Sequence, residues 1–489
     1  MKKPNVLWIC ADQQRYDTIT ALGNPIIRTP ALDEMAAKGA VFTRAYTQCP
    51  VCTPSRASFL TGRYPKTTRV CRNGNEYFPS DEILVTKLFA LQGYKCGLVG
   101  KLHLSAAEEI VEVRPDDGYG FFEWSEHPHD DWEQGHAYQD WLKAKGIDWS
   151  EVYCLGDGKN QSDPQLSPWK KILPSGKGGM DESYHQATWA FERAEYFIET
   201  CGESPWLLSI NIFDPHPPFD PPKAYRDRID SEKIPLPKYR EGELDGKPPF
   251  QRFDYEHGGQ NGTGPCYKTT SDADKRQFIA DYYAQIELID RKVEGIIAFL
   301  KKTGQYENTI ILYHSDHGEM LGDHGLYWKG CYVYEELLHI PLLFLWEGRI
   351  KSGLHCTGLT ELVDLAPTLL ELCGMEIPYY MQGKSLVPVL TGKTPPHTGK
   401  SHIYSEYYNA MKGIHEKYVS IYFDGRYKIA VHHGEELGEL YDLKVDPGEF
   451  ENLWDVPEHR ELKFTLLKHC FDSTLMATMD PKPRVIRYF

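Results

Sequence analysis

The sequence predicts an α/β fold in which a large, mostly parallel sheet is flanked by helices. Four short apolar runs, rich in β-branched residues, each end in polar residues. Continuous runs of this length are typical of strands that are buried on both faces of a sheet. Helical patterns lie between these runs and are followed by glycine, which is common just beyond a helix end.

The expected elements alternate along the chain. We expect strands at residues 6–11, 94–100, 207–213 and 309–314, and helices at residues 80–92 and 272–302. The polar side chains that follow the four strands are Asp12 and Gln13, Lys101 and His103, Asp214 and His216, and Asp316 and His317. Ligands in such folds bind beyond the carboxyl ends of the strands, so we expect these side chains to share one site.

The 489 residues exceed one ordinary hydrophobic core, so we expect a large domain and a smaller one. The large α/β domain is expected at residues 1–375, and a C-terminal subdomain with an antiparallel sheet and a helix at residues 376–489. Within the subdomain, the Asp-Gly pair at 424–425 separates two apolar runs and predicts a hairpin. Two insertions in the large domain, about residues 116–180 and 214–270, are long enough to form lids or binding loops.

The net charge of −16 and the isoelectric point of about 5.6 argue against a general nucleic-acid or anionic-membrane partner. No apolar run is long enough to span a membrane, and the short N-terminal run ends at Asp12, which is not typical of a signal peptide. As it stands, the chain is expected to be cytoplasmic with its twelve cysteines reduced. It would be periplasmic or secreted if a signal peptide has been removed.

Residues 52–63, Cys-Thr-Pro-Ser-Arg-Ala-Ser-Phe-Leu-Thr-Gly-Arg, combine a cysteine with helix signals. Pro54 suits the first turn of a helix and Gly62 suits its end. Cys52 would then lie at the helix N-terminus, which favours negative charge, with Arg56 one turn further on the same face. Cys49 and Cys52 also form a C-x-x-C, but no second such pair follows at zinc-finger spacing, which disfavours a zinc site or a redox pair.

This segment resembles the signature of the type I sulfatases, Cys-x-Pro-Ser-Arg followed by Leu-Thr-Gly-Arg. In that family, part of the alkaline phosphatase superfamily, a sulfatase-maturing enzyme oxidises the cysteine to formylglycine, and the hydrate of this aldehyde is the nucleophile. The resemblance covers nearly the whole chain, including the Leu-Tyr-Asp-Leu stretch at 440–443 and the Asp-Pro-Gly-Glu stretch at 446–449. It implies an enzyme that hydrolyses sulfate esters. A buried structural cysteine is the alternative.

The resemblance also implies a metal site. Asp12 matches the first metal-binding acid of the family, and Asp316 with His317 matches the second pair. Gln13 stands where a second aspartate is usual, and an oxidised Cys52 would complete the set. Oxygen ligands suit Ca²⁺, which we expect first, or Mg²⁺, and the histidine leaves Mn²⁺ open. Taken alone, an aspartate after a strand is usually a turn or cap residue.

Further residues match the positions around the sulfate in this family: Lys101, His103, His216, Lys329 and, as in some relatives, Asn73. With Arg56, the first four would surround an anion whose charge shifts in the transition state. The resemblance implies that His103 is the base that helps to release sulfate, and that His216 or Lys329 protonates the leaving oxygen.

Other side chains were harder to assign from the sequence. Asp323 and His324 suit either a supporting role at the site or an ordinary loop. His127, His129 and His136 could hold another metal ion, although a solvated loop is the better interpretation.

Two rival functions stay open. Phosphonate monoester or phosphodiester hydrolases share the fold, the formylglycine and an Asp-Gln and Asp-His metal set, but they lack the Lys-x-His pair. A non-catalytic sulfoglycan-binding relative would keep Cys52 as a thiol. The substrate is expected to be a sulfated small molecule or a glycan. A sugar is preferred because aromatic residues of the first insertion could stack on it: Trp124, Trp132, Trp141, Trp149 and Trp169. Ordinary packing explains these tryptophans equally well.

Overall fold

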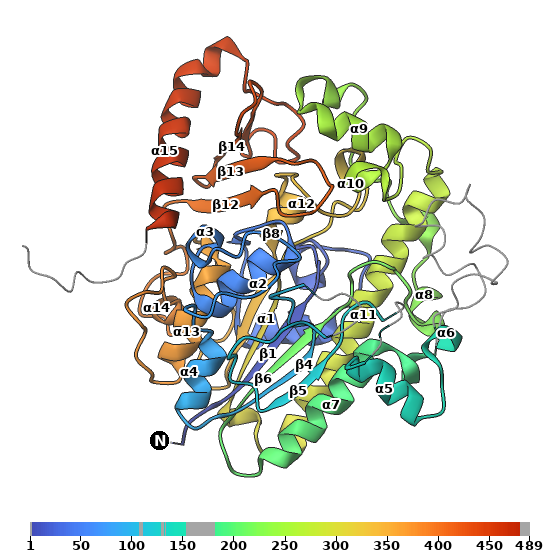
Figure 1. Ribbon diagram of the computed structural model, residues 1–489, viewed down its shortest axis with the longest axis vertical. Coiled ribbons are helices and arrows are strands. Elements are labelled where there is room, and N and C mark those ends of the chain that lie inside the picture. The colour runs from blue at the N-terminus through green and yellow to red at the C-terminus, as the bar shows by residue number, and fades with distance from the viewer. Residues whose placement is uncertain (1, 107–110, 129–131, 133, 153–180, 480–489) are drawn as a thin grey trace, which may run out of the picture.

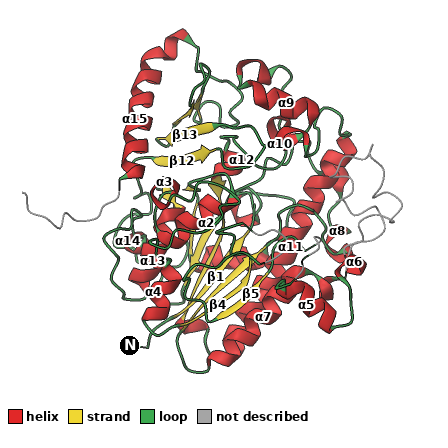
Figure 2. Cartoon of the chain, in the orientation of Figure 1, coloured by secondary structure: helices red, strands yellow, loops and turns green. Residues whose placement is uncertain are grey.

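The computed structural model describes residues 2–106, 111–128, 132, 134–152 and 181–479. A large sheet lies at the centre of this part of the chain, with helices on both of its faces (Figures 1 and 2). The predicted α/β fold is therefore confirmed.

The middle of the sheet consists of the four predicted strands. They are β1 (Asn5–Ala11), β4 (Lys95–Gly100), β6 (Trp206–Ile212) and β7 (Thr309–Ser315). Each of these bounds lies within one residue of the prediction. The strands that the sequence did not reveal are β2 (Ala40–Phe42), β5 (Phe121–Trp124), β9 (Leu342–Leu345) and β10 (Leu354–Cys356). Three or four residues are too few to show a periodic pattern.

Within the described residues, the sheet has the strand order β10-β2-β9-β7-β1-β6-β4-β5. All of its strands run parallel except β9, which is antiparallel to both β7 and β2. The carboxyl ends of β1, β4, β6 and β7 therefore meet at one edge.

Residues of β1 face alternate sides of the sheet because side chains alternate along a strand. Leu7 and Ile9 pack in a core with α7 (Gln186–Cys201) and α11 (Asp272–Lys302). Trp8 packs in a second core, on the side of α2 (Cys52–Thr61). Burial on both faces explains why the run is continuously apolar.

The two predicted helices differ in how well they were located. Helix α11 has the predicted bounds, and the Ser271 Oγ caps it by accepting the Asp274 N–H at 3.1 Å. Helix α4 (Val85–Leu91) begins five residues later than predicted. The preceding turn is held instead by a nearly buried ion pair, 3.1 Å long, between Arg63 and Glu82. This tertiary contact overrides the local helical pattern.

The C-terminal part carries the predicted antiparallel sheet, and its helix packs against that sheet (Figure 1). These elements are β12 (Ile403–Tyr408), β13 (Tyr418–Phe423), β14 (Tyr427–His432), β15 (Glu439–Asp442) and α15 (Arg460–Thr478). The hairpin at 424–425 is confirmed by the pairing of β13 with β14. Tyr46 and Val51 share a core with Ile421 of β13, so the two parts are packed together. A division at residue 375 stays a prediction.

Smaller elements complete the described chain. A three-stranded sheet has β11 (Thr360–Glu361), β3 (Ala45–Tyr46) and β8 (His339–Ile340). Short helices of the large part are α1 (Pro30–Lys38), α3 (Pro65–Thr68), α12 (Glu335–Leu338), α13 (Leu365–Leu372) and α14 (Val387–Leu390). The insertions contain α5 (Ala137–Ala144), α6 (Trp149–Val152), α8 (Lys223–Arg226), α9 (Pro249–His257) and α10 (Gly259–Gly262).

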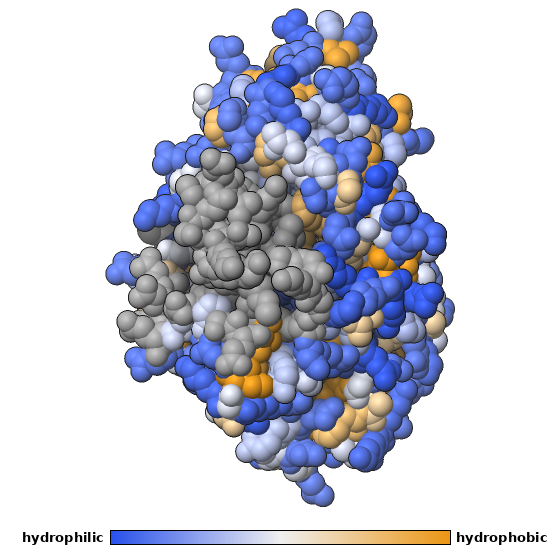
Figure 3. Space-filling view, turned by 90° about the vertical axis from the view of Figure 1, so that its right-hand side faces the viewer, coloured by the Kyte–Doolittle hydropathy of each residue, from blue (hydrophilic) through white to orange (hydrophobic). Residues whose placement is uncertain are grey.

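One exposed face of the molecule is mostly polar (Figure 3), and the cysteines of the described part of the chain form no disulfides. The face in Figure 3 is mostly hydrophilic, with hydrophobic residues scattered over it. None of the helices that the structure describes combines the length and the apolar character that a bilayer crossing requires. Eleven cysteines lie in the described residues, and all of them are free.

Candidate active site

The N-terminus of α2 holds Cys52. Cys52 is the first residue of the helix, after Val51, whose backbone is extended, and Gly62 ends the helix with a left-handed φ of 69°. The Oδ1 of Asn73 accepts the backbone N–H of Thr53 at 2.9 Å, which satisfies one free donor at this end. Cys52 is fully buried and lies where the remaining N–H groups favour an anion.

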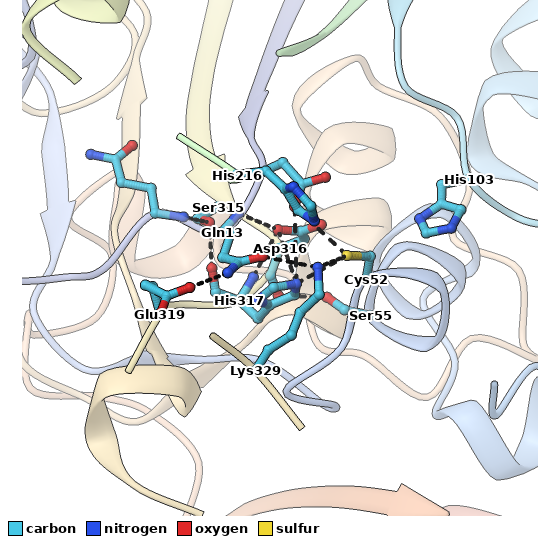
Figure 4. Close-up of polar contacts among 12 residues, drawn as sticks. Gln13, Cys52, Ser55, His103, His216, Ser315, Asp316, His317, Glu319 and Lys329 are labelled. Atoms are coloured by element: carbon cyan, nitrogen blue, oxygen red, sulfur yellow. Dashed lines mark hydrogen bonds and ion pairs between the residues drawn. The ribbon is translucent and has the colours of Figure 1, made fainter. Parts of the chain in front are cut away.

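Four potential metal-ligand atoms meet at the carboxyl ends of β1 and β7. Asp12 follows β1, and Asp316 and His317 follow the neighbouring parallel strand. The ligand atoms of these residues and the Sγ of Cys52 lie within 4.8 Å of one another, and all four side chains are buried. Figure 4 shows Asp316 and His317 beside Cys52. The structure thus brings together residues that are up to 305 positions apart in the sequence.

The ring of His317 is oriented for metal binding. Its Nδ1 lies 2.8 Å from the carbonyl oxygen of Gly318, which can only accept, so Nδ1 carries the proton. In the neutral ring Nε2 is then unprotonated, and it faces the Sγ of Cys52 at 3.1 Å. Metal-binding histidines usually hold their other ring nitrogen in this way. Two carboxylates and this imidazole therefore fit a divalent ion such as Ca²⁺, Mg²⁺ or Mn²⁺.

Arg56 holds the two carboxylates from inside the protein. Its Nε donates to Asp316 Oδ2 at 3.0 Å, and its Nη2 donates to Asp12 Oδ2 at 3.2 Å. Its Nη1 donates to the backbone oxygen of Lys101 at 2.9 Å. Arg56 is fully buried and does not line the cavity described below, so it differs from the expectation that it would face the anion. Burial disfavours the charge of Asp12, but Lys101 and Arg56 hold the pKa of that carboxyl well below its ordinary value.

Gly100 lets Lys101 enter the site. It has a φ of 103°, and a Cβ at this position would overlap the backbone oxygen of Asn211 on β6. That oxygen accepts the N–H of Lys101 at 3.0 Å, and the Asn211 side chain donates to the Lys101 carbonyl at 2.7 Å. The Nζ of Lys101 thereby lies 2.7 Å from Asp12 Oδ2 and 3.8 Å from the Sγ of Cys52.

Lys329 is the second lysine at Cys52. Its Nζ donates to the Sγ of Cys52 and to the Oε1 of Gln13, both at 2.9 Å. The other end of the Gln13 amide donates to Glu319, so the amide oxygen is fixed toward Lys329. Burial and Asp12 raise the pKa of Cys52, but Lys101, Lys329 and His317 outweigh them and lower it overall. The site therefore stabilises a negative charge at the position of the Cys52 side chain.

A cavity of about 300 Å³ lies next to Cys52. It is lined by Gln13, Asn73, Lys101, His103, Glu126, His127, His216, Pro217, Gln260, Trp328, Lys329 and Met411. The structure therefore brings Lys101, His103, His216 and Lys329 together around one space, as the sequence predicts. Asn73 and Gln13 line it as well. Two lysines thus line one cavity of a chain whose net charge is −16.

Two of the three histidines that line the cavity, His216 and His103, are neutral bases. The Nδ1 of His216 lies 2.7 Å from the carbonyl oxygen of Pro217 and so carries a proton, which leaves Nε2 as an acceptor. Burial and Lys329 hold the pKa of His216 well below its ordinary value. Burial and the charge of Lys101 likewise hold the pKa of His103 well below its ordinary value. A neutral imidazole accepts a proton more readily than it gives one, so Lys329 is the better proton donor of the predicted pair.

Sequence reasoning missed several residues of the cavity. Glu126 and His127 follow the unpredicted strand β5, and Trp328 directly precedes Lys329. Gln260 and Trp328 both have left-handed backbones, which no sequence pattern revealed. Met411 comes from the C-terminal part, beyond the predicted domain boundary. His127 is one of the three histidines that the sequence offers as possible metal ligands, and the structure places it in the cavity wall instead. The other residues gave no signal except, for some, a position beside a predicted site residue.

The tryptophans of the first insertion pack inside the protein. Trp124 is 1% exposed and meets the ring of Trp132 edge-on at 4.9 Å. Trp141 and Trp149 pack against the core that contains α7. None of these four tryptophans lines the cavity, so the alternative of ordinary packing holds for them. Trp169 lies outside the described residues.

The remaining acids and histidines have structural partners. Asp323 pairs with Arg15 at 2.9 Å, and His324 pairs with Glu243 at 3.2 Å, both away from the cavity lining. His136 caps α5. His129 lies outside the described residues.

A second group of potential metal ligands consists of His185, Asp214 and Asp220. However, the Nδ1 of His185 accepts the N–H of Ala187 at 3.1 Å, so its Nε2 carries the proton. The ring therefore offers no lone pair to a metal ion.

The fold and the site together define the class of the protein. Buried carboxylates suited to a divalent ion, a helix N-terminus and two lysines surround one nucleophile position at the carboxyl edge of a parallel sheet. This arrangement is that of a metal-assisted hydrolase of anionic esters.

Comparison with known proteins narrows the class. A family model described as Sulfatase matches residues 4–375, and one described as N-sulphoglucosamine sulphohydrolase, C-terminal, matches residues 322–474. An arylsulfatase of Clostridium perfringens is 30% identical over 474 residues, covering 94% of this chain and 92% of the relative. An N-acetylglucosamine-6-O-sulfatase of Bacteroides thetaiotaomicron is 25% identical over 511 residues, covering 96% and 85%. The structure of a phosphonate monoester hydrolase from Silicibacter pomeroyi superposes with a TM-score of 0.79 at 26% identity, covering 98% and 96%.

The chain belongs to the formylglycine-dependent sulfatase family of the alkaline phosphatase superfamily. It is a sulfuric ester hydrolase. The family implies a divalent metal ion and a formylglycine, and the buried ligand set of the structure agrees with both.

Proposed function

We propose that the chain hydrolyses a sulfate ester of a carbohydrate, with Cys52 as the precursor of the nucleophile. The observation that carries this proposal is the surroundings of the Cys52 Sγ, which has Lys329 at 2.9 Å, His317 at 3.1 Å and Lys101 at 3.8 Å. Formylglycine at this position would supply the hydroxyl that attacks sulfur. Because Cys52 is fully buried, a maturing enzyme must reach it before this fold is complete.

We propose that Asp12, Asp316 and His317 hold one divalent ion, with Ca²⁺ first and Mg²⁺ or Mn²⁺ as alternatives. When bound, the ion would draw charge from the sulfate oxygens and lower the pKa of the attacking hydroxyl. Arg56 supports this role because its guanidinium forms buried ion pairs with both carboxylates and so holds them in place. Gln13 stays at the edge of the set, since its oxygen already accepts a hydrogen bond from Lys329.

The other residues of the cavity have roles that follow from their contacts. Lys101 and Lys329 stabilise the charge that develops on the sulfate oxygens in the transition state. Neutral His103 takes the proton when sulfate is released, and Lys329 protonates the leaving oxygen. Arg56 does not contact the substrate in this proposal and acts indirectly, by holding the two carboxylates that it binds.

The residues that line the cavity favour a carbohydrate substrate. Glu126 and His127 belong to the first insertion, and Pro217 and Gln260 belong to the second. Carboxylate and amide oxygens accept hydrogen bonds from hydroxyl groups, and the ring of Trp328 offers a face for a pyranose. The relative from Bacteroides thetaiotaomicron is named an N-acetylglucosamine-6-O-sulfatase, and this name also favours a sulfated sugar as the substrate.

A phosphonate monoester hydrolase is the second candidate. The structural likeness to such an enzyme favours it, as do the Gln13 and His317 of the metal set. The placement of both Lys101 and His103 at the cavity favours sulfate. A non-catalytic binding relative is a weaker candidate, because a binding module needs no nucleophile.

Mass spectrometry of the Cys52 peptide, followed by paired assays, tests these candidates. An aldehyde at Cys52 excludes the binding relative. Faster hydrolysis of a sulfate ester than of a phosphonate monoester supports the proposal, and the reverse ratio overturns it. We expect Cys52→Ala to abolish turnover with the fold intact. Cys52→Ser should also be nearly inactive, because a sulfated alcohol lacks the second hydroxyl whose deprotonation forms the carbonyl and expels sulfate. Full activity of Cys52→Ser would rule out the formylglycine mechanism.

A further inference from the structure

The cavity for an anionic ester contains one carboxylate that lines its wall but takes no part in the chemical steps proposed above. Glu126 lies two residues beyond β5, its side chain is nearly buried, and it lines the cavity. Its Oε1 lies 3.4 Å from the Nε2 of His103 and 3.6 Å from the Nζ of Lys101. An acid at this place repels the sulfate, so its presence calls for a compensating function.

The contact with His103 determines which ring nitrogen is basic. A carboxylate only accepts hydrogen bonds, so the nitrogen that faces Glu126 carries the proton. A neutral imidazole has one proton, and Nδ1 is then the unprotonated nitrogen. Within the described residues, the buried Nδ1 of His103 has no hydrogen-bond partner. Nδ1 is therefore the ring nitrogen with an unused lone pair. The separation of 3.4 Å is long, but catalytic hydrogen bonds often tighten only when substrate is bound.

The protein fixes both sides of this contact. His103 has a left-handed backbone with a φ of 56°, which for such a residue persists only where its surroundings impose it. The carboxylate of Glu112 accepts the N–H of Leu104 at 3.0 Å and so holds the segment after His103. On the other side, Gln186 donates to the backbone oxygen of Glu126 at 3.0 Å. The ring and the carboxylate are therefore held opposite each other from separate elements.

Lys101 lies almost as close to Glu126 as His103 does, and its charge opposes the rise that burial causes in the pKa of Glu126. Its ammonium already makes a 2.7 Å ion pair with Asp12, and 3.6 Å separates it from Glu126. His127 lies still farther from Glu126, at 3.9 Å, and is more exposed. The contact with His103 is thus the closest that Glu126 makes to a charged or titratable side chain of the cavity.

We propose that Glu126 is a positioning residue, whose carboxylate orients His103 and keeps its proton on Nε2 so that Nδ1 is the base. The inference rests on the proposed role of His103 in the sulfatase reaction. A carboxylate that orients a catalytic histidine through its second nitrogen is a recurring arrangement in hydrolases.

A double-mutant cycle tests the inference, with kcat and KM measured on a small aryl sulfate. We expect Glu126→Ala to lower kcat by about ten- to a hundredfold with little change in KM. In the His103→Ala background, Glu126→Ala should change kcat less than about twofold, because a positioning residue acts only through its partner. The isosteric Glu126→Gln, which keeps the volume, provides a second test if the alanine variant is unstable. The matched control is Glu123→Ala, on β5 itself, whose carboxylate pairs with Arg193 and does not line the cavity.

The outcomes separate this inference from the proposed function. If Glu126→Ala lowers kcat equally in both backgrounds, the carboxylate acts on the substrate or through Lys101, and the inference is overturned. If Glu126→Ala and Glu126→Gln both leave kcat unchanged, it is overturned as well. If His103→Ala itself keeps full activity, the role of His103 in the proposed function fails first.

Discussion

Replacing Lys329 by methionine is predicted to slow catalysis without removing the metal ion. The ammonium of Lys329 lies 2.9 Å from both the Sγ of Cys52 and the Oε1 of Gln13, and it is nearly buried. Methionine keeps the unbranched stem, so the substitution removes the charge with little change in packing.

The expected magnitude follows from this geometry. Two unit charges about 4 Å apart interact by about 4 kcal/mol at an effective dielectric constant of about 20. Only the part of this interaction that grows in the transition state lowers the barrier. Removal of one donor to a developing anion commonly costs about 10²–10³ in kcat. We expect Lys329→Met to lose activity within this range.

The assay compares kcat on a small aryl sulfate with the metal content of the same preparation. The control is Lys247→Met, another buried lysine, which bonds to the backbone of Glu449 and lies outside the cavity lining. We expect the control to lose stability but to keep its kcat when folded. A loss of less than about threefold for Lys329→Met, with metal retained, would refute the assigned role.

Three further predictions concern the metal, the cavity wall and acid stability. Asp316→Ala should lose the divalent ion and activity together, and full metal occupancy by elemental analysis would contradict the ligand assignment. Trp328→Ala should lower kcat/KM on a sulfated sugar about tenfold or more while sparing a small aryl sulfate, whereas Trp141→Ala should not discriminate; equal effects of Trp328→Ala on both substrates would make that ring a packing residue. Glu439 is buried, but its hydrogen bond from His432 contributes to lowering its pKa to about 2. The resulting stability is present above the unfolded pKa of about 4.3 and is lost as the pH falls toward 2. Glu439→Gln should therefore cost about 3 kcal/mol at pH 7 and clearly less at pH 3 in urea unfolding, and an equal cost at both pH values would contradict this reasoning.

The sheet could be predicted because its central strands are long and buried on both faces. β1 and β7 each carry seven buried residues, so their apolar runs end abruptly at Asp12 and Asp316. The same pattern located the two acids that we propose as metal ligands, since parallel strands bring their carboxyl ends together. β5 has four residues, three of them half-exposed, and gave no such signal. Glu126 was missed for that reason.

Residues whose role depends on tertiary contacts could not be assigned from the sequence. The motif correctly placed Arg56 near Cys52, but only the fold shows that its three kinds of nitrogen are taken by Asp12, Asp316 and a backbone oxygen. Trp328 became a candidate platform because of its backbone conformation and its place beside Lys329. Composition alone pointed instead to the tryptophans of the first insertion, which are packed inside.

Met411 gives the cavity a wall that comes from the C-terminal part, while the backbone N–H of Asn73 bonds to the carbonyl of Ala410. The groups proposed for catalysis meet near the carboxyl edge of the sheet, whereas the two insertions and the C-terminal part contribute other residues to the cavity wall. Substitutions in one of these segments can therefore change part of the cavity wall without changing the residues proposed for the chemical steps. A chimera that receives residues 401–417 from a relative should therefore acquire part of the substrate preference of that relative. Its catalytic residues would still be those of this chain. Deleting the C-terminal part would leave the cavity open on one side.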